Sequence, residues 1–179
     1  LMVDVGTNGE IVLFHKEHLI CCATAAGPAF EGAGLSCGMR GVAGAIDHVN
    51  WENGSWKVHV IGDREASTAE GICVIDGVAG LLESGLLEDT GYLEEDVCFA
   101  GNVGLTAEDI REVQLAKGAI RAGMETLLAE EKIDAAGLEG LYVAGGFGSY
   151  MSAKSAERIG LFPKIDLSRI KICGNAALA

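Results

Sequence analysis

Two glycine-rich segments contain the residue types best suited to contacting a phosphorylated ligand. The first, residues 4–9, reads Asp-Val-Gly-Thr-Asn-Gly, and the second, residues 144–149, reads Ala-Gly-Gly-Phe-Gly-Ser. Each follows a short apolar run typical of a buried strand. Glycine has no Cβ, so its backbone can approach a ligand closely and its N–H can point outward toward an anion. Together the two segments predict half of a nucleotide-binding cleft.

The charge of the chain limits how such a site can work. The sequence has 26 acidic and 13 basic side chains, a net charge of −13. This argues against a nucleic-acid partner, because affinity for a phosphate backbone requires clustered Lys and Arg. A phosphate site here is therefore expected to use backbone N–H groups and a metal ion. The four histidines lack a spacing typical of metal ligands, and we assign them no role.

The six cysteines, at positions 21, 22, 37, 73, 98 and 173, form no CxxC pair. This spacing does not support a zinc site or a redox-active dithiol. Their apolar neighbours predict reduced, buried thiols in a cytoplasmic protein, and the alternative is a cluster bridging two subunits. No apolar run reaches membrane-spanning length and no signal-peptide pattern is present, so we expect no membrane partner. Because the sequence starts at Leu1 and not at a methionine, we expect further sequence upstream of residue 1.

The elements that must position the two segments follow from hydrophobic periodicity. The pattern predicts strands at Val3–Val5, Glu10–Phe14 and His18–Thr24, helices at Ile72–Leu87 and Ala107–Glu131, a strand at Leu141–Val143, a helix at Ser152–Ile159 and a strand at Ile170–Cys173. Three antiparallel strands followed by alternating helices and strands are the ribonuclease H-like order. The predicted fold class is therefore α/β, with a mixed sheet, flanking helices and an inserted β-hairpin.

The inserted hairpin is predicted at Asn53-Gly54, a dipeptide that favours a two-residue type I′ turn. That register places Trp51 opposite Trp56 and gives the hairpin one apolar side. We expect this side to pack on the domain, and the alternative is a partner surface.

In the long helix, Thr106 and Asp109 form a capping-box pattern. Gly118 and Gly123 each cost about 1 kcal/mol relative to alanine inside a helix, so we expect another backbone or a ligand to approach the helix there. The apolar stripe consists of Ile110, Val113, Ile120, Met124, Leu127 and Leu128.

Both glycine-rich segments, on this topology, resemble the acetate and sugar kinase/heat-shock chaperone/actin superfamily. Four further segments narrow the resemblance to the C-terminal domain of reductive activators of corrinoid proteins: TAAGPAFEGAG (24–34), IREVQLAKGAIRAG (110–123), AERIGLFP (156–163) and GNAALA (174–179). The resemblance implies that residues 1–179 are the second, C-terminal lobe of an actin-like ATPase. The first lobe and an iron-sulfur domain would lie outside this chain. One departure is that Gly71-Ile72-Cys73 continues directly into Val74-Ile75-Asp76, where the family has an additional Gly-Ser-Gly.

The resemblance implies an ATP-dependent enzyme that restores Co(II) corrinoid proteins to Co(I), with hydrolysis driving uphill electron transfer. The implied cofactors are ATP and Mg²⁺, with a two-iron cluster in the missing N-terminal domain. The implied partners are a corrinoid protein and, in a homodimer, a second copy. The fragment alone is expected to be inactive. Alternatives are an activator of another low-potential enzyme such as a 2-hydroxyacyl-CoA dehydratase, a small-molecule kinase, and a non-catalytic nucleotide-sensing module.

Residue roles are carried over from the resemblance. Asp4 would hold Mg²⁺ through water or orient the attacking water, and its alternative is an acceptor of turn N–H groups. The residues predicted to contact phosphate are Gly6, Thr7, Asn8 and Gly9. The alternative is that they form an ordinary hairpin turn. The residues predicted to contact adenosine are Gly145, Gly146, Phe147, Gly148 and Ser149. The alternative is that they form only a strand-to-helix turn. On the long helix, the residues that could reach the base or ribose are Glu112, Gln114 and Lys117. The alternative is that these residues form a solvated helix face. Phe30 and Glu31 are placed near the cleft mouth or a dimer surface.

Overall fold

Two separate stretches of the chain build the first of two structural units. The computed structural model describes residues 1–39, 41–62, 65–66, 68–146 and 151–174. Unit 1 consists of Leu1–Gly27 and Ala116–Ala179, and unit 2 consists of Pro28–Leu115. The division falls within helix α2 (Ala107–Glu130). None of the helices in the described residues is long and apolar enough to cross a membrane.

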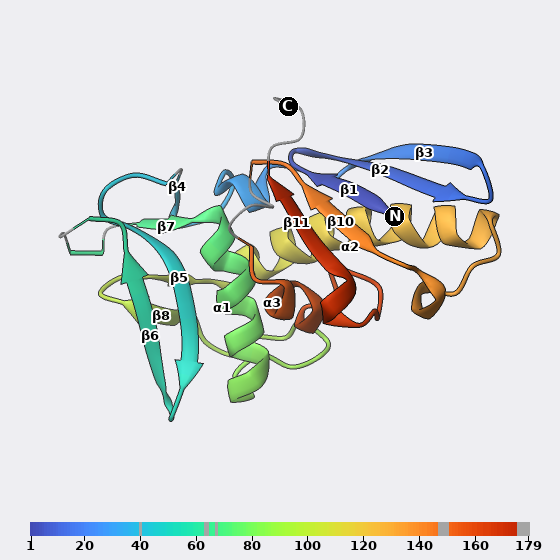
Figure 1. Ribbon diagram of the computed structural model, residues 1–179. Coiled ribbons are helices and arrows are strands. Elements are labelled where there is room, and N and C mark those ends of the chain that lie inside the picture. The colour runs from blue at the N-terminus through green and yellow to red at the C-terminus, as the bar shows by residue number, and fades with distance from the viewer. Residues whose placement is uncertain (40, 63–64, 67, 147–150, 175–179) are drawn as a thin grey trace. The chain divides into compact units, whose positions relative to one another are not determined.

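Unit 1 contains a five-stranded mixed sheet with the order β11-β10-β1-β2-β3 (Figure 1). Its strands are β1 (Met2–Val5), β2 (Asn8–His15), β3 (His18–Ala25), β10 (Leu141–Ala144) and β11 (Ile170–Gly174). Neighbours are antiparallel from β1 to β3, whereas β10 is parallel to both β1 and β11. This confirms the order predicted from the sequence.

Helix α2 covers one face of this sheet. A Cβ on Gly123 would lie 2.5 Å from Ile11 Cδ1 and 2.7 Å from Thr24 Cγ2, so the helix can approach β2 and β3 only because this residue is glycine. The close approach predicted for Gly123 is therefore confirmed. The corresponding position on Gly118 has no described neighbour within 4 Å. The predicted apolar stripe is buried along its whole length.

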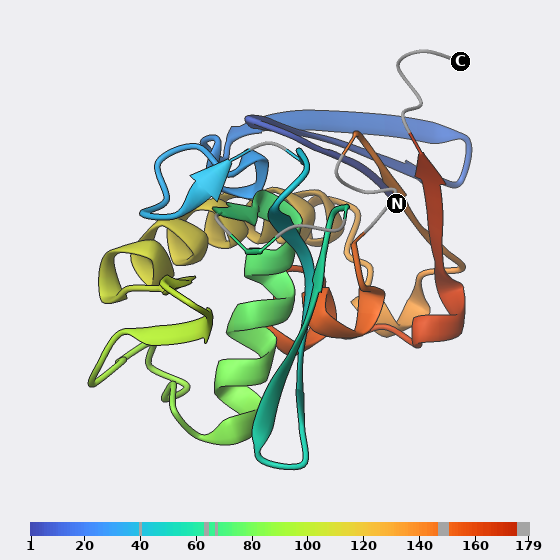
Figure 2. The ribbon, with the colours of Figure 1, turned by 90° about the vertical axis from the view of Figure 1, so that its left-hand side faces the viewer.

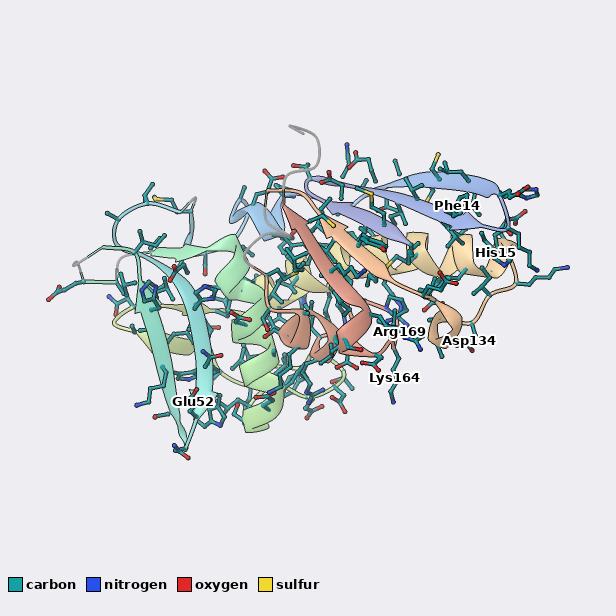
Figure 3. All side chains as sticks on the ribbon, in the orientation of Figure 1. Phe14, His15, Glu52, Asp134, Lys164 and Arg169 are labelled. Carbon is teal, nitrogen blue, oxygen red and sulfur yellow. The ribbon has the colours of Figure 1, made fainter. Side chains whose placement is uncertain are left out.

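Basic side chains connect the remaining elements of unit 1 to α2 and to each other by donating hydrogen bonds to backbone carbonyl groups. Lys117 Nζ donates to Ile159 O at 2.5 Å and an Arg121 nitrogen donates to Phe162 O at 2.5 Å, just after α3 (Ala153–Arg158). Arg169, in the 3₁₀ turn η3 (Leu167–Arg169), donates to Ala136 O and Leu138 O around η2 (Ala135–Gly137) (Figure 3). Basic groups at helix ends satisfy carbonyls that lack a helical partner.

Unit 2 has a four-stranded sheet with the order β4-β7-β5-β6 and a separate two-stranded ribbon (Figure 2). The sheet strands are β4 (Gly38–Met39), β5 (Ala45–Glu52), β6 (Ser55–Val60) and β7 (Thr68–Glu70), and the ribbon strands are β8 (Val97–Ala100) and β9 (Val103–Leu105). Helix α1 (Gly71–Ser84) and the 3₁₀ turn η1 (Ala29–Glu31) complete the unit. The strands β4, β7, β8 and β9 were not predicted from the sequence.

The predicted Asn-Gly hairpin is confirmed as β5–β6. Asn53 and Gly54 have φ values of 51° and 78°, as a type I′ turn requires, and Trp51 pairs with Trp56. The Trp56 ring lies 4.7 Å from the Phe99 ring, and a Cβ on Gly80 of α1 would be 2.6 Å from the Trp56 side chain. The apolar side of the hairpin therefore packs on unit 2.

The predicted capping box at the start of α2 is also confirmed. The Asp109 backbone N–H donates to Thr106 Oγ1 at 3.2 Å, and the Thr106 N–H donates to Asp109 Oδ2 at 2.9 Å. The Asp109 carboxylate is buried and also accepts the Ser36 N–H at 2.7 Å. The cap therefore also fastens the loop that precedes β4.

Two expectations about burial are wrong. The prediction of buried thiols holds only for Cys73: Cys21, Cys98 and Cys173 are exposed, and Cys22 and Cys37 are half-buried. Apolar neighbours in sequence are misleading for Cys21, because alternate residues of a strand point to opposite faces. Phe30, placed at a surface by the sequence interpretation, is fully buried. Residues 71–76, where the additional Gly-Ser-Gly of the family is absent, form part of the continuous helix α1.

Candidate functional site

The two glycine-rich turns meet at one end of the unit 1 sheet. Strands β1 and β10 are parallel neighbours, with Asp4 paired to Ala144, so the turns that follow them lie at the same sheet edge. Asp4 Oδ1 lies 2.7 Å from the position that a Cβ on Gly145 would take, and Val5 O lies 2.6 Å from it. The residues predicted from two distant parts of the sequence are thus adjacent in space.

The first turn combines an exposed tip with a buried base. The Gly6 N–H donates to Asn8 O at 3.1 Å, and Thr7 and Asn8 are exposed. Gly9 is buried within β2, where a Cβ would lie 2.8 Å from Thr24 Oγ1 and 2.9 Å from Ile120 Cγ1. The packing of α2 is therefore sufficient to require glycine at position 9. Gly6, Thr7 and Asn8 are the residues available to a ligand.

A third segment, residues 24–27, lies beside the first turn and was assigned no ligand role from the sequence. Thr24 Oγ1 donates to Gly9 O at 3.4 Å, and the Gly27 N–H donates to Thr7 O at 2.9 Å. Gly27 has a φ of 78°, and no residue in the described part of the chain lies within 4 Å of its Cβ position. The Gly-Pro dipeptide directly after a predicted strand was the available signal.

The second turn depends on the backbone conformation of Gly145. Its φ is 102°, a conformation that residues with a Cβ rarely adopt, and its N–H donates to Gly174 O at 3.1 Å. Gly146 differs, because no described residue lies near its Cβ position and its φ lies outside the left-handed region. Phe147, Gly148 and Ser149 lie outside the described residues.

The three predicted helix residues do not form one ligand-facing group. Glu112 and Gln114 are two positions apart, which places them on opposite sides of α2. Glu112 is exposed, and Gln114 Nε2 donates to Thr90 O at 3.2 Å within unit 2. Lys117 is bonded to Ile159 O, and burial, with a smaller effect of nearby Arg121, lowers the pKa of its ammonium group.

Among the described residues of the two turns, Asp4 supplies the sole ionisable side chain. The first turn otherwise offers backbone groups, the Thr7 hydroxyl and the Asn8 amide, and the described residues of the second turn offer backbone groups. This composition can contact an anion through N–H groups and can hold a hydrated divalent cation at one carboxylate.

Comparison with known proteins supports the resemblance seen in the sequence. The family described as the C-terminal domain of RACo, the ASKHA domain, matches residues 1–179. The chain belongs to this family. A solved structure of a reductive activator for corrinoid, iron-sulfur protein superimposes with a TM-score of 0.89 at 35% identity, covering 99% of this chain and 32% of that chain. The ASKHA-type fold class is therefore established, and an ASKHA domain implies nucleotide binding.

Two curated relatives have similar levels of identity. One is the corrinoid activation enzyme RamQ of Eubacterium limosum, 35% identical over 206 residues, which cover 99% of this chain and 35% of that protein. The other is the [Co(II) methylated amine-specific corrinoid protein] reductase of Methanosarcina barkeri, 34% identical over 203 residues, which cover 100% of this chain and 37% of that protein. The chain thus spans about a third of the length of these relatives.

Proposed function

We propose that unit 1 binds ATP at the paired turns, with phosphates against Gly6, Thr7 and Asn8 and adenosine against the turn that begins at Gly145. The observation that supports this most is the pairing of Asp4 with Ala144, which puts both turns at one sheet edge. The described residues leave the Cβ positions of Gly27 and Gly146 open, which provides room for a ligand next to the backbone.

A magnesium ion fits this arrangement. The turns lack a basic side chain among the described residues, so the negative charge of ATP needs another counter-charge. Mg²⁺, when bound, would neutralise the phosphates and keep several of its waters. Asp4 would accept hydrogen bonds from one of those waters, and its half-buried position at the end of β1 fixes the direction of the carboxylate.

We further propose that residues 1–179 are the C-terminal lobe of an ATP-dependent reductive activator that returns a Co(II) corrinoid protein to Co(I). The names of both relatives and of the similar structure support this assignment. The first ATPase lobe and a two-iron cluster domain would belong to the remaining two thirds of such a protein. ATP hydrolysis would then drive the uphill electron transfer from the cluster toward the corrinoid.

The substitution Asp4→Asn in the full-length protein tests the site. A carboxylate that orients water or a hydrated metal acts mainly on the transition state, so kcat for ATP hydrolysis should fall at least about tenfold while the Kd for ATP changes less than about threefold. The matched control is Glu10→Gln, an exposed carboxylate on the neighbouring strand directly opposite Asp4, which should change neither value. Turnover within about twofold of the unmodified protein would make Asp4 a structural residue of the turn. ATP binding without any turnover in the unmodified protein would instead favour a nucleotide-sensing module.

A further inference from the structure

The four histidines of the chain form two cross-strand pairs, His15 with His18 and His48 with His59. The second pair belongs to the β5–β6 hairpin, which lies beside α1 (Figures 1 and 2). Its imidazole centroids are 6.5 Å apart, whereas the first pair has no such ring contact in the described part of the chain. The separation of His48 and His59 along the sequence gives no ligand-like spacing, so only the folded hairpin reveals this pair.

Each ring of the second pair has a carboxylate at its Nδ1 atom. The register of the hairpin shifts between Ile46 and His48, so Asp47 is an extra residue on β5, and its Oδ1 lies 2.5 Å from His59 Nδ1. On the other ring, Asp76 Oδ2 of α1 lies 3.4 Å from His48 Nδ1. Asp76 is only 5% exposed, so its surroundings fix the direction of the carboxylate.

These contacts determine which nitrogen of each ring is available to a ligand. An ionised carboxylate only accepts hydrogen bonds, so Nδ1 carries the proton in both neutral imidazoles. The free electron pair of each ring is then on Nε2, on the side of the ring away from the carboxylate. A carboxylate that holds the Nδ1–H group is the usual second partner of a histidine that binds a metal ion through Nε2.

The surroundings of the pair favour a transition-metal ion. The His48 side chain is 45% exposed and the His59 side chain 68%, so an ion can reach both rings from solvent. Unit 2 contains 16 acidic but only 4 basic side chains, so its field attracts cations. Neutral imidazoles suit Zn²⁺, Cu²⁺ and Ni²⁺, whereas Mg²⁺ prefers oxygen ligands. The chemistry of this pair therefore differs from that proposed for Asp4.

We propose that His48 and His59 bind one divalent transition-metal ion of the Zn²⁺ class through their Nε2 atoms. With Zn–N bonds of about 2.1 Å, a tetrahedral ion holds two imidazole centroids about 5 Å apart, so the rings must close by roughly 1.5 Å. The exposed His59 side chain has room for this movement. The described residues contain no group of three or more His, Cys, Asp or Glu side chains arranged around one ion, so water completes the coordination. The ion joins the two strands of the hairpin and, through Asp76, connects them to α1.

Calorimetric titration of zinc chloride into the nucleotide-free chain tests the site. The thiols are first alkylated with iodoacetamide, because the exposed Cys21, Cys98 and Cys173 could bind zinc themselves. A single ion per chain should bind with a micromolar Kd. Zinc should also raise Tm, since an ion that binds the folded chain stabilises it against unfolding.

His48→Gln and His59→Gln should each raise the Kd for zinc at least about tenfold and remove the rise in Tm. Without zinc, their circular dichroism spectra should match that of the unmodified chain. His59 is the more exposed of the two, so His59→Gln decides the outcome if His48→Gln does not fold. The matched control is His18→Gln, at an exposed histidine of the other cross-strand pair, which should change neither the Kd nor the rise in Tm. Equal zinc affinity in His59→Gln and His18→Gln would overturn the proposal.

Long-range proton–nitrogen correlation spectra of the imidazole rings test the geometry. Without zinc, His48 and His59 should have the Nδ1–H tautomer. Zinc should shift their Nε2 resonances while Nδ1 stays protonated, and should leave His15 and His18 unaffected. A chain that binds no zinc at millimolar concentration would overturn the proposal, and so would zinc-dependent shifts confined to His15 and His18.

Discussion

At the scale of single residues, adjacent glycines in the second turn have different physical reasons to be glycine. Gly145 has a positive φ and lies against Val5 O and Asp4 Oδ1, so the folded backbone itself excludes a side chain. Gly146 has neither constraint, so only a ligand or residues beyond the described part would require glycine there. The sequence pattern Gly-Gly-Phe-Gly located this turn but could not separate these roles, because φ and close contacts depend on the tertiary fold.

We expect Gly145→Ala to destabilise the protein. A left-handed conformation costs an alanine about 1–3 kcal/mol, and the contacts below 3 Å add to this. For a domain of this size, each kcal/mol lowers Tm by roughly 2–4 °C, which differential scanning calorimetry resolves. Gly146→Ala provides the control and should leave Tm nearly unchanged. Equal Tm values for both variants would show that Gly145 is not constrained in the way described.

At the scale of elements, local signals predicted most of the structure. The Asn53-Gly54 turn and the Thr106–Asp109 cap act through neighbouring residues, and both formed as expected. The short strands β4 and β7 were not predicted, because their structure depends on pairing with segments distant in the sequence. The exposure of Cys21 was missed because only the tertiary structure shows which face of β3 is covered. Cys22 and Thr24 face α2, so Cys21 points to the other face.

The cap at the start of α2 should be among the costliest positions to alter. Asp109→Ala would remove a buried carboxylate that accepts the N–H groups of both Ser36 and Thr106. Losing a cap and leaving buried donors unpaired should lower the free energy of unfolding by about 3 kcal/mol, measured by urea denaturation. Glu108→Ala, at the exposed neighbouring position in the same helical turn, should cost under about 0.5 kcal/mol. A cost for Asp109→Ala as small as that for Glu108→Ala would contradict this account of the cap.

At the scale of the whole molecule, the chain spans about a third of the length of the relatives it resembles, so the catalytic role proposed for it would also need groups that lie outside it. The paired turns are proposed to supply one side of a phosphate site. The opposing phosphate turn of the first ATPase lobe is proposed to lie in the remaining sequence. Sequence motifs could locate the paired turns because each is a contiguous segment, but Lys117 shows the limit of this approach. Its ammonium group donates to Ile159 O, a contact that no motif could indicate, and its ligand role stays a prediction.

The isolated chain should therefore hydrolyse ATP negligibly. Catalysis of phosphoryl transfer depends on groups that surround the phosphates, and one lobe provides only part of them. Phosphate release from the 179-residue chain should stay at the level of a protein-free blank, while the full-length protein turns over. If the fragment matched the turnover of the full-length protein, the assignment of this chain to a single ATPase lobe would be wrong.

The central claim is that ATP binds beside the backbone of the second turn, and calorimetric titration of ATP into full-length protein carrying Gly146→Val tests it most directly. No described residue lies within 4 Å of the Cβ position at Gly146, so the fold should tolerate the substitution, with an unchanged circular dichroism spectrum and Tm. The valine side chain would then occupy space assigned to the nucleotide, and we predict at least a tenfold increase in the Kd for ATP while the affinity for the corrinoid protein is retained. An unchanged Kd for ATP in the folded variant would contradict the account and place the nucleotide away from this turn.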